Sequence, residues 1–135
     1  MKTQTVLFWI ARIIAAIILL QTLFFKFTGA PESVEIFSKL GIEPWGRIGT
    51  GILEFITALL ILIPFTVWLG SILAIGLMAG ALFSHLTVLG IVVQNDHGQL
   101  FLYALIVLAC ASFSFWKSKN QIPLSLKKLL PSFLQ

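Results

Sequence analysis

The residues with the most potential for chemistry are a few ionisable side chains inside long apolar stretches. Arg12 interrupts the first stretch, Lys26 ends it, and Glu54 lies inside the second. A carboxylate buried in hydrocarbon is unfavourable by several kcal/mol unless it is protonated, hydrated or paired with a cation. Because Arg12 and Lys26 are 14 residues apart, they return to nearly the same helix face. We therefore predict a buried charge cluster of Arg12, Lys26 and Glu54.

A second arrangement of these charges remains open. In it, the Lys26 side chain extends to the membrane surface and Arg12 alone neutralises Glu54, which gives a structural ion pair without chemistry. Thr50 and Thr57 lie four residues before and three residues after Glu54, so they share its helix face. In both arrangements this face points into a bundle of helices.

Two further polar side chains, His85 and Tyr103, belong to the third and fourth apolar stretches, near the polar turn at residues 94–98. Together with Lys26 and Glu54 they would gather polar groups inside an apolar wall, which is typical of a ligand pocket. Lys26, His85 or Tyr103 could donate a hydrogen bond to a ligand, and Glu54 and His85 could relay protons. We predict a ligand-binding or proton-relay site of these four residues.

Small residues recur at every fourth position of the third stretch, at Gly76, Gly80 and Ser84. Such a ridge allows another helix to approach closely. We predict a helix-packing role for these three residues. Packing within the bundle is the favoured interpretation, and a homodimer face is the alternative.

Resident cofactors are not expected in this chain. Cys110 is the only cysteine, which excludes an intrachain disulfide and a CxxC redox pair. His85 and His97 are the only histidines, and His97 belongs to a polar turn, where it is badly placed for bis-histidine haem ligation inside a bundle. No HExxH, phosphate-binding glycine loop or serine elbow is present. We expect no metal, no catalytic residue and no autonomous enzyme activity.

The elements that must position these residues are membrane-spanning helices. Of the 135 residues, 59% are apolar and 10% are charged, against roughly 25% charged in soluble domains. About 80 apolar residues suit four spans of roughly 20 residues each. We predict an all-α protein, a bundle of four transmembrane helices over residues 1–116 and a basic cytoplasmic tail over residues 117–135. The predicted spans are 5–25, 46–63, 66–90 and 100–116.

The segment between the first two spans is polar but has a helical pattern. Pro31 suits a first helical turn, Gly41 suits a C-terminus, and apolar residues recur three apart between them. A short amphipathic helix on the outer membrane surface is predicted, and an ordered surface loop is the alternative.

Charge indicates the orientation of the predicted bundle. Nine Lys and Arg residues exceed five Asp and Glu residues, for a net charge of +4. The basic residues are scattered along the chain, with four of the nine in the tail, which disfavours nucleic acid as a partner. The positive-inside rule predicts a multi-pass protein of the cytoplasmic (inner) membrane with both termini in the cytoplasm.

With these residues identified, the chain resembles the DoxX family of small four-span membrane proteins over roughly residues 7–116. The resemblance depends on Arg12, on Phe-Phe-Lys-Phe at residues 24–27, on Gly-Thr-Gly-Ile-Leu-Glu at residues 49–54, and on the Gly- and Ala-rich residues 70–81. A typical member has glycine where this chain has Thr22 or Leu23, so the chain departs from the family pattern there.

The resemblance implies a four-helix membrane bundle and an association with thiosulfate and quinone redox chemistry or with oxidative-stress complexes. We therefore expect an accessory subunit of a membrane redox system that binds a quinone, a lipid or a similar apolar molecule in the outer half of the bundle. Its partners would be the lipid bilayer and a redox protein. The alternative is a non-enzymatic assembly or partner-binding protein in which the charge cluster is purely structural. A proton-coupled carrier is least favoured, because no inverted repeat is present.

Overall fold

The computed structural model describes residues 2–134, and every regular element in that range is helical. The long helices are α1 (Lys2–Gln21), α4 (Trp45–Leu62), α5 (Val67–Ser84) and α6 (Gln99–Ser118). Shorter elements are α2 (Leu23–Phe27), α3 (Pro31–Lys39), α7 (Leu124–Lys127), the π-helical turn η1 (His85–Leu89) and the 3-10 turns η2 (Lys119–Gln121) and η3 (Ser132–Leu134).

Four continuous helical segments are long and apolar enough to span a membrane, as predicted. They are Lys2–Phe27, Trp45–Leu62, Val67–Leu89 and Gln99–Gln121. The fourth segment extends five residues beyond the predicted boundary at residue 116, because the 3-10 turn η2 continues α6. The prediction of a four-helix membrane bundle is therefore confirmed.

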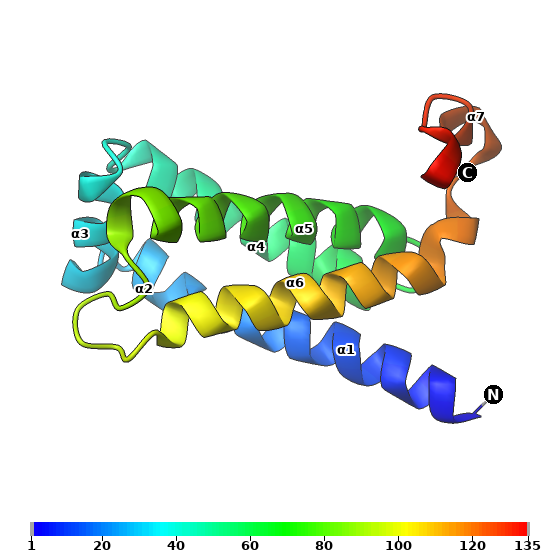
Figure 1. Ribbon diagram of the computed structural model, residues 1–135, viewed down its shortest axis with the longest axis horizontal. Coiled ribbons are helices and arrows are strands. Elements are labelled where there is room, and N and C mark those ends of the chain that lie inside the picture. Colours follow the sequence, from blue (N-terminus) through cyan, green and yellow to red (C-terminus); the bar gives the residue numbers. More distant parts are fainter. Residues whose placement is uncertain (1, 135) are drawn as a thin grey trace.

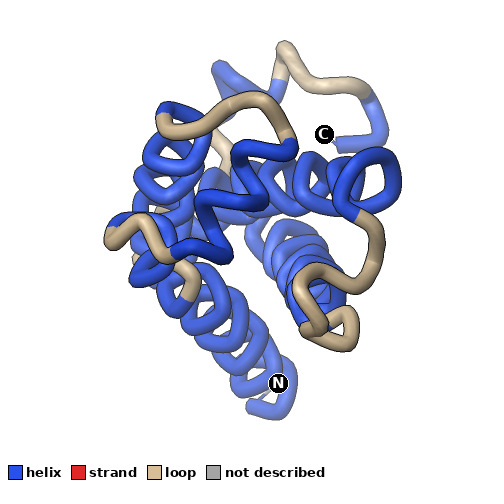
Figure 2. The backbone as a smooth tube through the Cα atoms, turned by 90° about the vertical axis from the view of Figure 1, so that its left-hand side faces the viewer, coloured by secondary structure: helices blue, strands red, loops and turns tan. Residues whose placement is uncertain are grey.

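The four long helices form a bundle in which α1 and α5 each contact both α4 and α6. Both described ends of the chain lie at one end of the molecule, whereas α3 lies at the opposite end (Figure 1). We call these the terminal end and the α3 end. Seen from the α3 end, α3 runs across the ends of the bundle helices rather than parallel to them (Figure 2).

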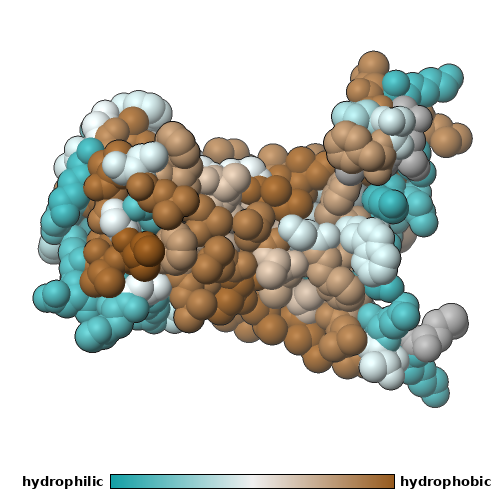
Figure 3. Space-filling model, in the orientation of Figure 1, coloured by the Kyte–Doolittle hydropathy of each residue, from teal (hydrophilic) through white to brown (hydrophobic). Residues whose placement is uncertain are grey.

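The interior of the bundle is built largely from small side chains. Ala15, Ala58, Ala74 and Ala111 are fully buried and belong to four different helices. Alanine lets helix backbones approach closely, which is how helices associate in lipid. Large apolar side chains lie instead on the outside, where they form a hydrophobic band between two hydrophilic ends (Figure 3).

The closest helix approach occurs at Gly70, at the start of α5. A Cβ atom at Gly70 would lie 2.6 Å from the backbone nitrogen of Ile61 in α4. Pro64 ends α4 because it cannot donate a helical hydrogen bond, and α5 begins at Val67, so the two helices form a tight hairpin. Gly70, which the sequence analysis did not single out, therefore makes the close packing possible.

The predicted packing ridge has a different environment. Gly76 and Gly80 are exposed, and a Cβ atom on either would meet nothing within 4 Å. The core-facing side of α5 carries Ala74 and Met78, and the fourfold spacing of the ridge places Gly76 and Gly80 away from that side. The prediction that Gly76 and Gly80 pack against another helix of the bundle is therefore wrong, whereas the packing role of Ser84 and the homodimer alternative stay predictions.

We expect Gly70→Ala to lower the free energy of unfolding by about 1–3 kcal/mol, because a rigid backbone atom occupies the space that the new methyl group needs. Gly76→Ala is the matched control on the same helix. It has open space around the methyl group and should be neutral or slightly stabilising, since alanine favours helix more than glycine does. Unfolding by titration with a denaturing detergent measures both variants. Equal stabilities would contradict this account of Gly70.

The helix between the first two spans is confirmed. It begins at Pro31, as its sequence predicts, and the chain turns at Gly41 with a φ of +74°. Phe37 and Ser33 are buried beneath it. On its outer surface Lys39 lies 2.9 Å from Glu35, and this hydrogen-bonded ion pair lowers the pKa of the Glu35 carboxyl. Because α3 is amphipathic, it packs one face on the bundle and covers the α3 end.

Candidate functional site

A cavity of about 710 Å³ occupies the α3 end of the bundle. Its wall includes residues from all four spans, from α3 and from the loop that precedes α6. The four predicted site residues Lys26, Glu54, His85 and Tyr103 all line it. The polar and charged lining side chains are Gln21, Thr22, Lys26, Glu32, Ser33, Thr50, Glu54, Ser84, His85, Gln94, Asp96, Gln99 and Tyr103.

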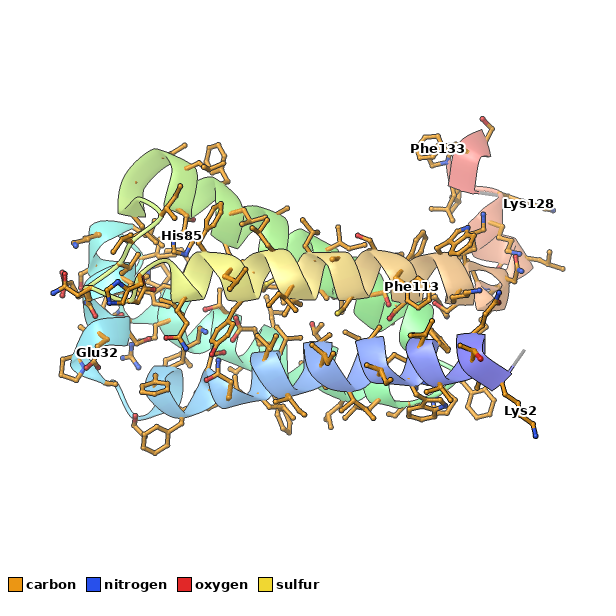
Figure 4. The ribbon with its side chains drawn as sticks, turned by 60° about the horizontal axis from the view of Figure 1, so that its bottom comes forward. Lys2, Glu32, His85, Phe113, Lys128 and Phe133 are labelled. Atoms are coloured by element: carbon orange, nitrogen blue, oxygen red, sulfur yellow. The ribbon has the colours of Figure 1, made fainter. Side chains whose placement is uncertain are left out.

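The remaining lining is mostly apolar and comes from α1, α2, α3, α5, η1 and α6 and from the segments that connect them. Gly76 and Gly80 contribute bare backbone to the wall. In the view with side chains, Glu32 of α3 and His85 at the end of α5 lie at the α3 end, opposite Lys2 and Lys128 at the terminal end (Figure 4). The structure therefore brings the predicted polar residues to one end of the bundle.

Lys26 and Glu54 form the charged part of the site. The Lys26 Nζ lies 2.9 Å from Glu54 Oε2, and both side chains are nearly buried. The Thr22 hydroxyl lies 3.0 Å from the same oxygen and 2.9 Å from the Leu19 carbonyl. The carboxylate is thus paired with a cation and held by a hydroxyl, as a charge inside a bilayer requires.

Thr22 is a site residue that the sequence analysis missed. It lies at the break between α1 and α2, one helical turn before Lys26, whose ammonium contacts Glu54 of α4. Arg47 fixes this arrangement from the other side, because its guanidinium donates to the Lys26 carbonyl and to the Glu43 carboxylate. The sequence feature that could have identified Thr22 is that this chain lacks the glycine that a typical family member has at residue 22 or 23.

Arg12 is not part of this cluster, contrary to the prediction. Its Nε donates to the Ile61 carbonyl at 2.8 Å and its Nη2 to the Leu62 carbonyl at 2.7 Å. Its guanidinium also lies 3.8 Å from the centre of the Trp9 ring. The alternative in which Arg12 alone neutralises Glu54 is wrong for the same reason. A helix C-terminus exposes unpaired carbonyls and a partial negative charge, and Arg12 neutralises both at the end of α4.

His85 is held in a defined orientation at the first residue of η1. Its Nδ1 lies 2.8 Å from the Gly90 carbonyl, and the Gly90 amide donates to the His85 carbonyl at the same distance. The ring also packs edge-on against Phe101, with centroids 5.7 Å apart. Because a carbonyl only accepts hydrogen bonds, Nδ1 carries the proton in this arrangement. Nε2 has no partner among the described residues and is free to bond a ligand.

Tyr103 reaches the cavity from α6. Gln99, one helical turn earlier, donates from Nε2 to the Tyr103 hydroxyl at 2.6 Å. The hydroxyl has accepted one hydrogen bond, and its own proton remains available for a ligand. The four predicted residues therefore differ in chemistry: Lys26 and Glu54 are paired with each other, whereas His85 and Tyr103 each keep a free hydrogen-bonding position.

The loop before α6 closes the cavity through Asp96 and Gln94, which the sequence analysis treated only as a polar turn. The Asp96 carboxylate accepts backbone hydrogen bonds from Val93, Gly98 and Leu100 at 2.8–3.1 Å. Burial raises the pKa of Asp96, but these hydrogen bonds and the nearby His85 outweigh burial and lower the pKa overall. Gln94 donates to the Glu35 carboxylate at 2.5 Å, so the loop is joined to α3.

Comparison with known proteins agrees with the geometry. The model of the DoxX-like family matches residues 10–114, a range that contains the second and third spans entirely, most of the first and fourth spans, and every residue of the cavity. No curated protein and no solved structure shows a significant match to the chain. The match covers well over half of the chain, so this membrane protein belongs to the DoxX-like family.

Proposed function

We propose that this protein binds a quinone or a similar small apolar ring in the cavity at the α3 end, as an accessory subunit of a membrane redox system. The observation that carries the proposal is the cavity itself, with its apolar wall and two free hydrogen-bonding positions at His85 and Tyr103. Binding sites for small apolar molecules have this composition.

The size and chemistry of the cavity fit such a ligand. A volume of about 710 Å³ lies within the roughly 300–1,000 Å³ usual for small-molecule sites. A quinone presents carbonyl oxygens that accept hydrogen bonds, and the Tyr103 hydroxyl is able to donate one, as is His85 Nε2 when the ring carries a second proton. When bound, a quinone accepts electrons and protons. Among the lining residues, His85 and Glu54 are the groups that could hold and transfer those protons.

A partner protein is part of the proposal. Cys110 is the only cysteine, so the chain has no dithiol that could deliver two electrons to a ligand. We infer that a redox partner supplies them. The protein would then act on its ligand by binding, orientation and proton transfer rather than as an autonomous enzyme.

The proposed setting is the inner membrane, with the terminal end in the cytoplasm. The described terminal end carries Lys2, Lys117, Lys119, Lys127 and Lys128 and no acidic residue, whereas Glu32, Glu35, Glu43 and Asp96 belong to the α3 end. Lysine and arginine in short segments next to spans determine orientation. The cavity would then open on the outer half of the bilayer.

A short-chain benzoquinone tests ligand binding by calorimetry on the detergent-purified protein. Gly80→Leu should reduce its affinity at least tenfold, because Gly80 lines the cavity, a Cβ atom there meets no atom within 4 Å, and the rest of the leucine side chain would occupy the space of the ligand. Ala79→Leu is the matched control, since Ala79 is the next residue on α5, is exposed and does not line the cavity. His85→Ala should also weaken binding, because it removes a hydrogen-bonding group.

The alternative function is a non-enzymatic assembly or partner-binding protein. It is favoured by the Lys26–Glu54 pair, whose charges satisfy each other without a ligand. If wild-type protein binds no quinone, and solvent extracts hold no apolar molecule beyond the background of control membranes, the ligand proposal fails. Crosslinking in membranes would then test the alternative, for which Glu54→Gln should preserve partner capture while lowering stability.

A further inference from the structure

Three hydroxyl groups are buried in the terminal half of the bundle with no hydrogen-bond partner among the described residues. They belong to Thr57 of α4, Ser71 of α5 and Ser114 of α6. Their side chains are 0–1% exposed, and none of them lines the cavity at the α3 end. A buried hydroxyl without a partner is unfavourable, so three of them would destabilise a small bundle substantially.

Helix packing brings these three hydroxyls to nearly the same depth. In antiparallel helices the residue numbers of facing positions have a constant sum. His85 contacts Phe101, and Ser71 precedes His85 by 14 residues, so Ser71 lies opposite the residue 14 positions after Phe101, which is residue 115, next to Ser114. In the same way Gly70 approaches Ile61, and Thr57 precedes Ile61 by four residues, so Thr57 lies opposite residue 74. The three hydroxyls thus lie within about one helical turn, roughly 5 Å, along the bundle axis.

The three hydroxyls also face a common interior. α5 packs against both α4 and α6, and burial of all three side chains directs them inward rather than to lipid. The opposite wall at this depth is α1. Two contacts show how α1 lies beside α4: Thr22 contacts Glu54, and Arg12 contacts Ile61. They place the part of α1 that includes the buried Ala16 at the same depth as Thr57. An alanine side chain cannot bond a hydroxyl, so Ala16 does not satisfy the three groups.

Other hydroxyls on the membrane helices behave differently. Thr50, Ser84, Thr87, Ser112 and Ser118 each donate to the carbonyl four residues earlier, at 2.6–2.9 Å. That bond is the usual way in which a serine or threonine satisfies itself inside a helix. Thr57, Ser71 and Ser114 are about as deeply buried as Ser118, but unlike Ser118 they do not make this bond. Their hydroxyls are therefore left for another partner inside the bundle.

We propose that Thr57, Ser71 and Ser114 together bind an internal water molecule that bridges α4, α5 and α6. Water in protein interiors makes about three hydrogen bonds to otherwise unsatisfied polar groups, and it can both donate to and accept from a hydroxyl. Because Thr57 follows Glu54 by one helical turn, the water lies on the terminal side of the charged part of the cavity. The site is independent of the quinone proposal.

Water-edited solid-state NMR on the full chain in lipid bilayers tests this site, with serine and threonine labelled with ¹³C. We expect magnetisation from water to reach the Ser71 and Ser114 side chains several-fold faster than it reaches the Ser112 side chain. Ser112 is the matched control, because it lies two residues from Ser114, faces outward and already bonds the Leu108 carbonyl. Transfer to Ser71 and Ser114 no faster than to Ser112 would overturn the proposal.

A substitution series gives a second, independent measurement. Thr57→Val, Ser71→Ala and Ser114→Ala remove the hydroxyls with little change of shape. If the hydroxyls share one water, the shift in unfolding midpoint of the triple variant will be smaller than the sum of the single shifts, because the water can be lost only once. Additive shifts would contradict a shared water. Ser112→Ala, which touches none of these groups, should combine additively with each of them.

Discussion

Replacing Arg12 by methionine is expected to lower the free energy of unfolding by about 2–5 kcal/mol, the largest stability effect at a single residue outside the charged pair. The substitution leaves the Ile61 and Leu62 carbonyls without their donors, at about 1–3 kcal/mol for each buried group. Methionine has a similar length and is apolar, so the loss reports on the hydrogen bonds, the charge and the contact with Trp9 rather than on a cavity. Unfolding by a denaturing detergent, followed by circular dichroism, measures the effect.

Arg12→Lys separates charge from geometry at the same position. Lysine keeps the positive charge at the C-terminus of α4, but its single ammonium group cannot reproduce the forked guanidinium that bonds two carbonyls and stacks on Trp9. We expect Arg12→Lys to lower the free energy of unfolding by at least half as much as Arg12→Met does. Lys39→Met is the surface control, since the Lys39–Glu35 pair is about half exposed and such pairs contribute at most about 1 kcal/mol. If Arg12→Met changes stability no more than Lys39→Met, Arg12 does not have the capping role.

Replacing Lys26 by methionine is expected to lower the free energy of unfolding by about 3–5 kcal/mol at neutral pH, because it leaves the Glu54 carboxylate buried without a cation. Thr22 would still donate one hydrogen bond, which is too little to stabilise a full charge in this environment. Unfolding by a denaturing detergent at neutral pH, followed by circular dichroism, measures the effect.

A double variant provides the control for this pair. Lys26→Met combined with Glu54→Leu removes both charges and should recover most of the stability lost by Lys26→Met alone, because a buried ion pair often contributes little more than apolar packing. Thr22→Val, which removes only the hydroxyl, should cost about 1 kcal/mol. A double variant as unstable as Lys26→Met would mean that the contact between the Lys26 and Glu54 side chains is not what stabilises this region.

The sequence by itself determined the class of the protein and the position of its helices along the chain. The excess of apolar residues and the long stretches without charge leave only helices that cross a membrane, because a bilayer satisfies no backbone polar group. Pro31 and Gly41 predicted α3, since their backbone preferences act locally. The residues of the family pattern were also sufficient to indicate the family, which the match over residues 10–114 confirmed.

The sequence also predicted which polar residues belong to the α3 end of the bundle. His85 and Tyr103 lie near residues 94–98 in the chain, and Glu54 and Lys26 lie near the other connection at the same end. Chain direction reverses at each span, so depth in the membrane follows from counting residues. That argument does not depend on contacts, and all four residues line one cavity.

The tertiary structure alone decided which side chains touch. A helical repeat shows that Arg12 and Lys26 share a face of α1, but it does not show how far α4 is shifted along that face. In the structure this axial shift brings Arg12 to the end of α4 and only Lys26 to Glu54.

The same reason explains the glycines. A small residue on a helix permits a close approach, but whether a neighbour is there depends on how the helices are rotated and shifted against each other. Gly70 has a backbone against it, whereas Gly76 and Gly80 face open space along the cavity. Local preferences and hydrophobicity are properties of the chain and can be calculated from it, but the pairing of distant side chains depends on the packing of all four helices at once.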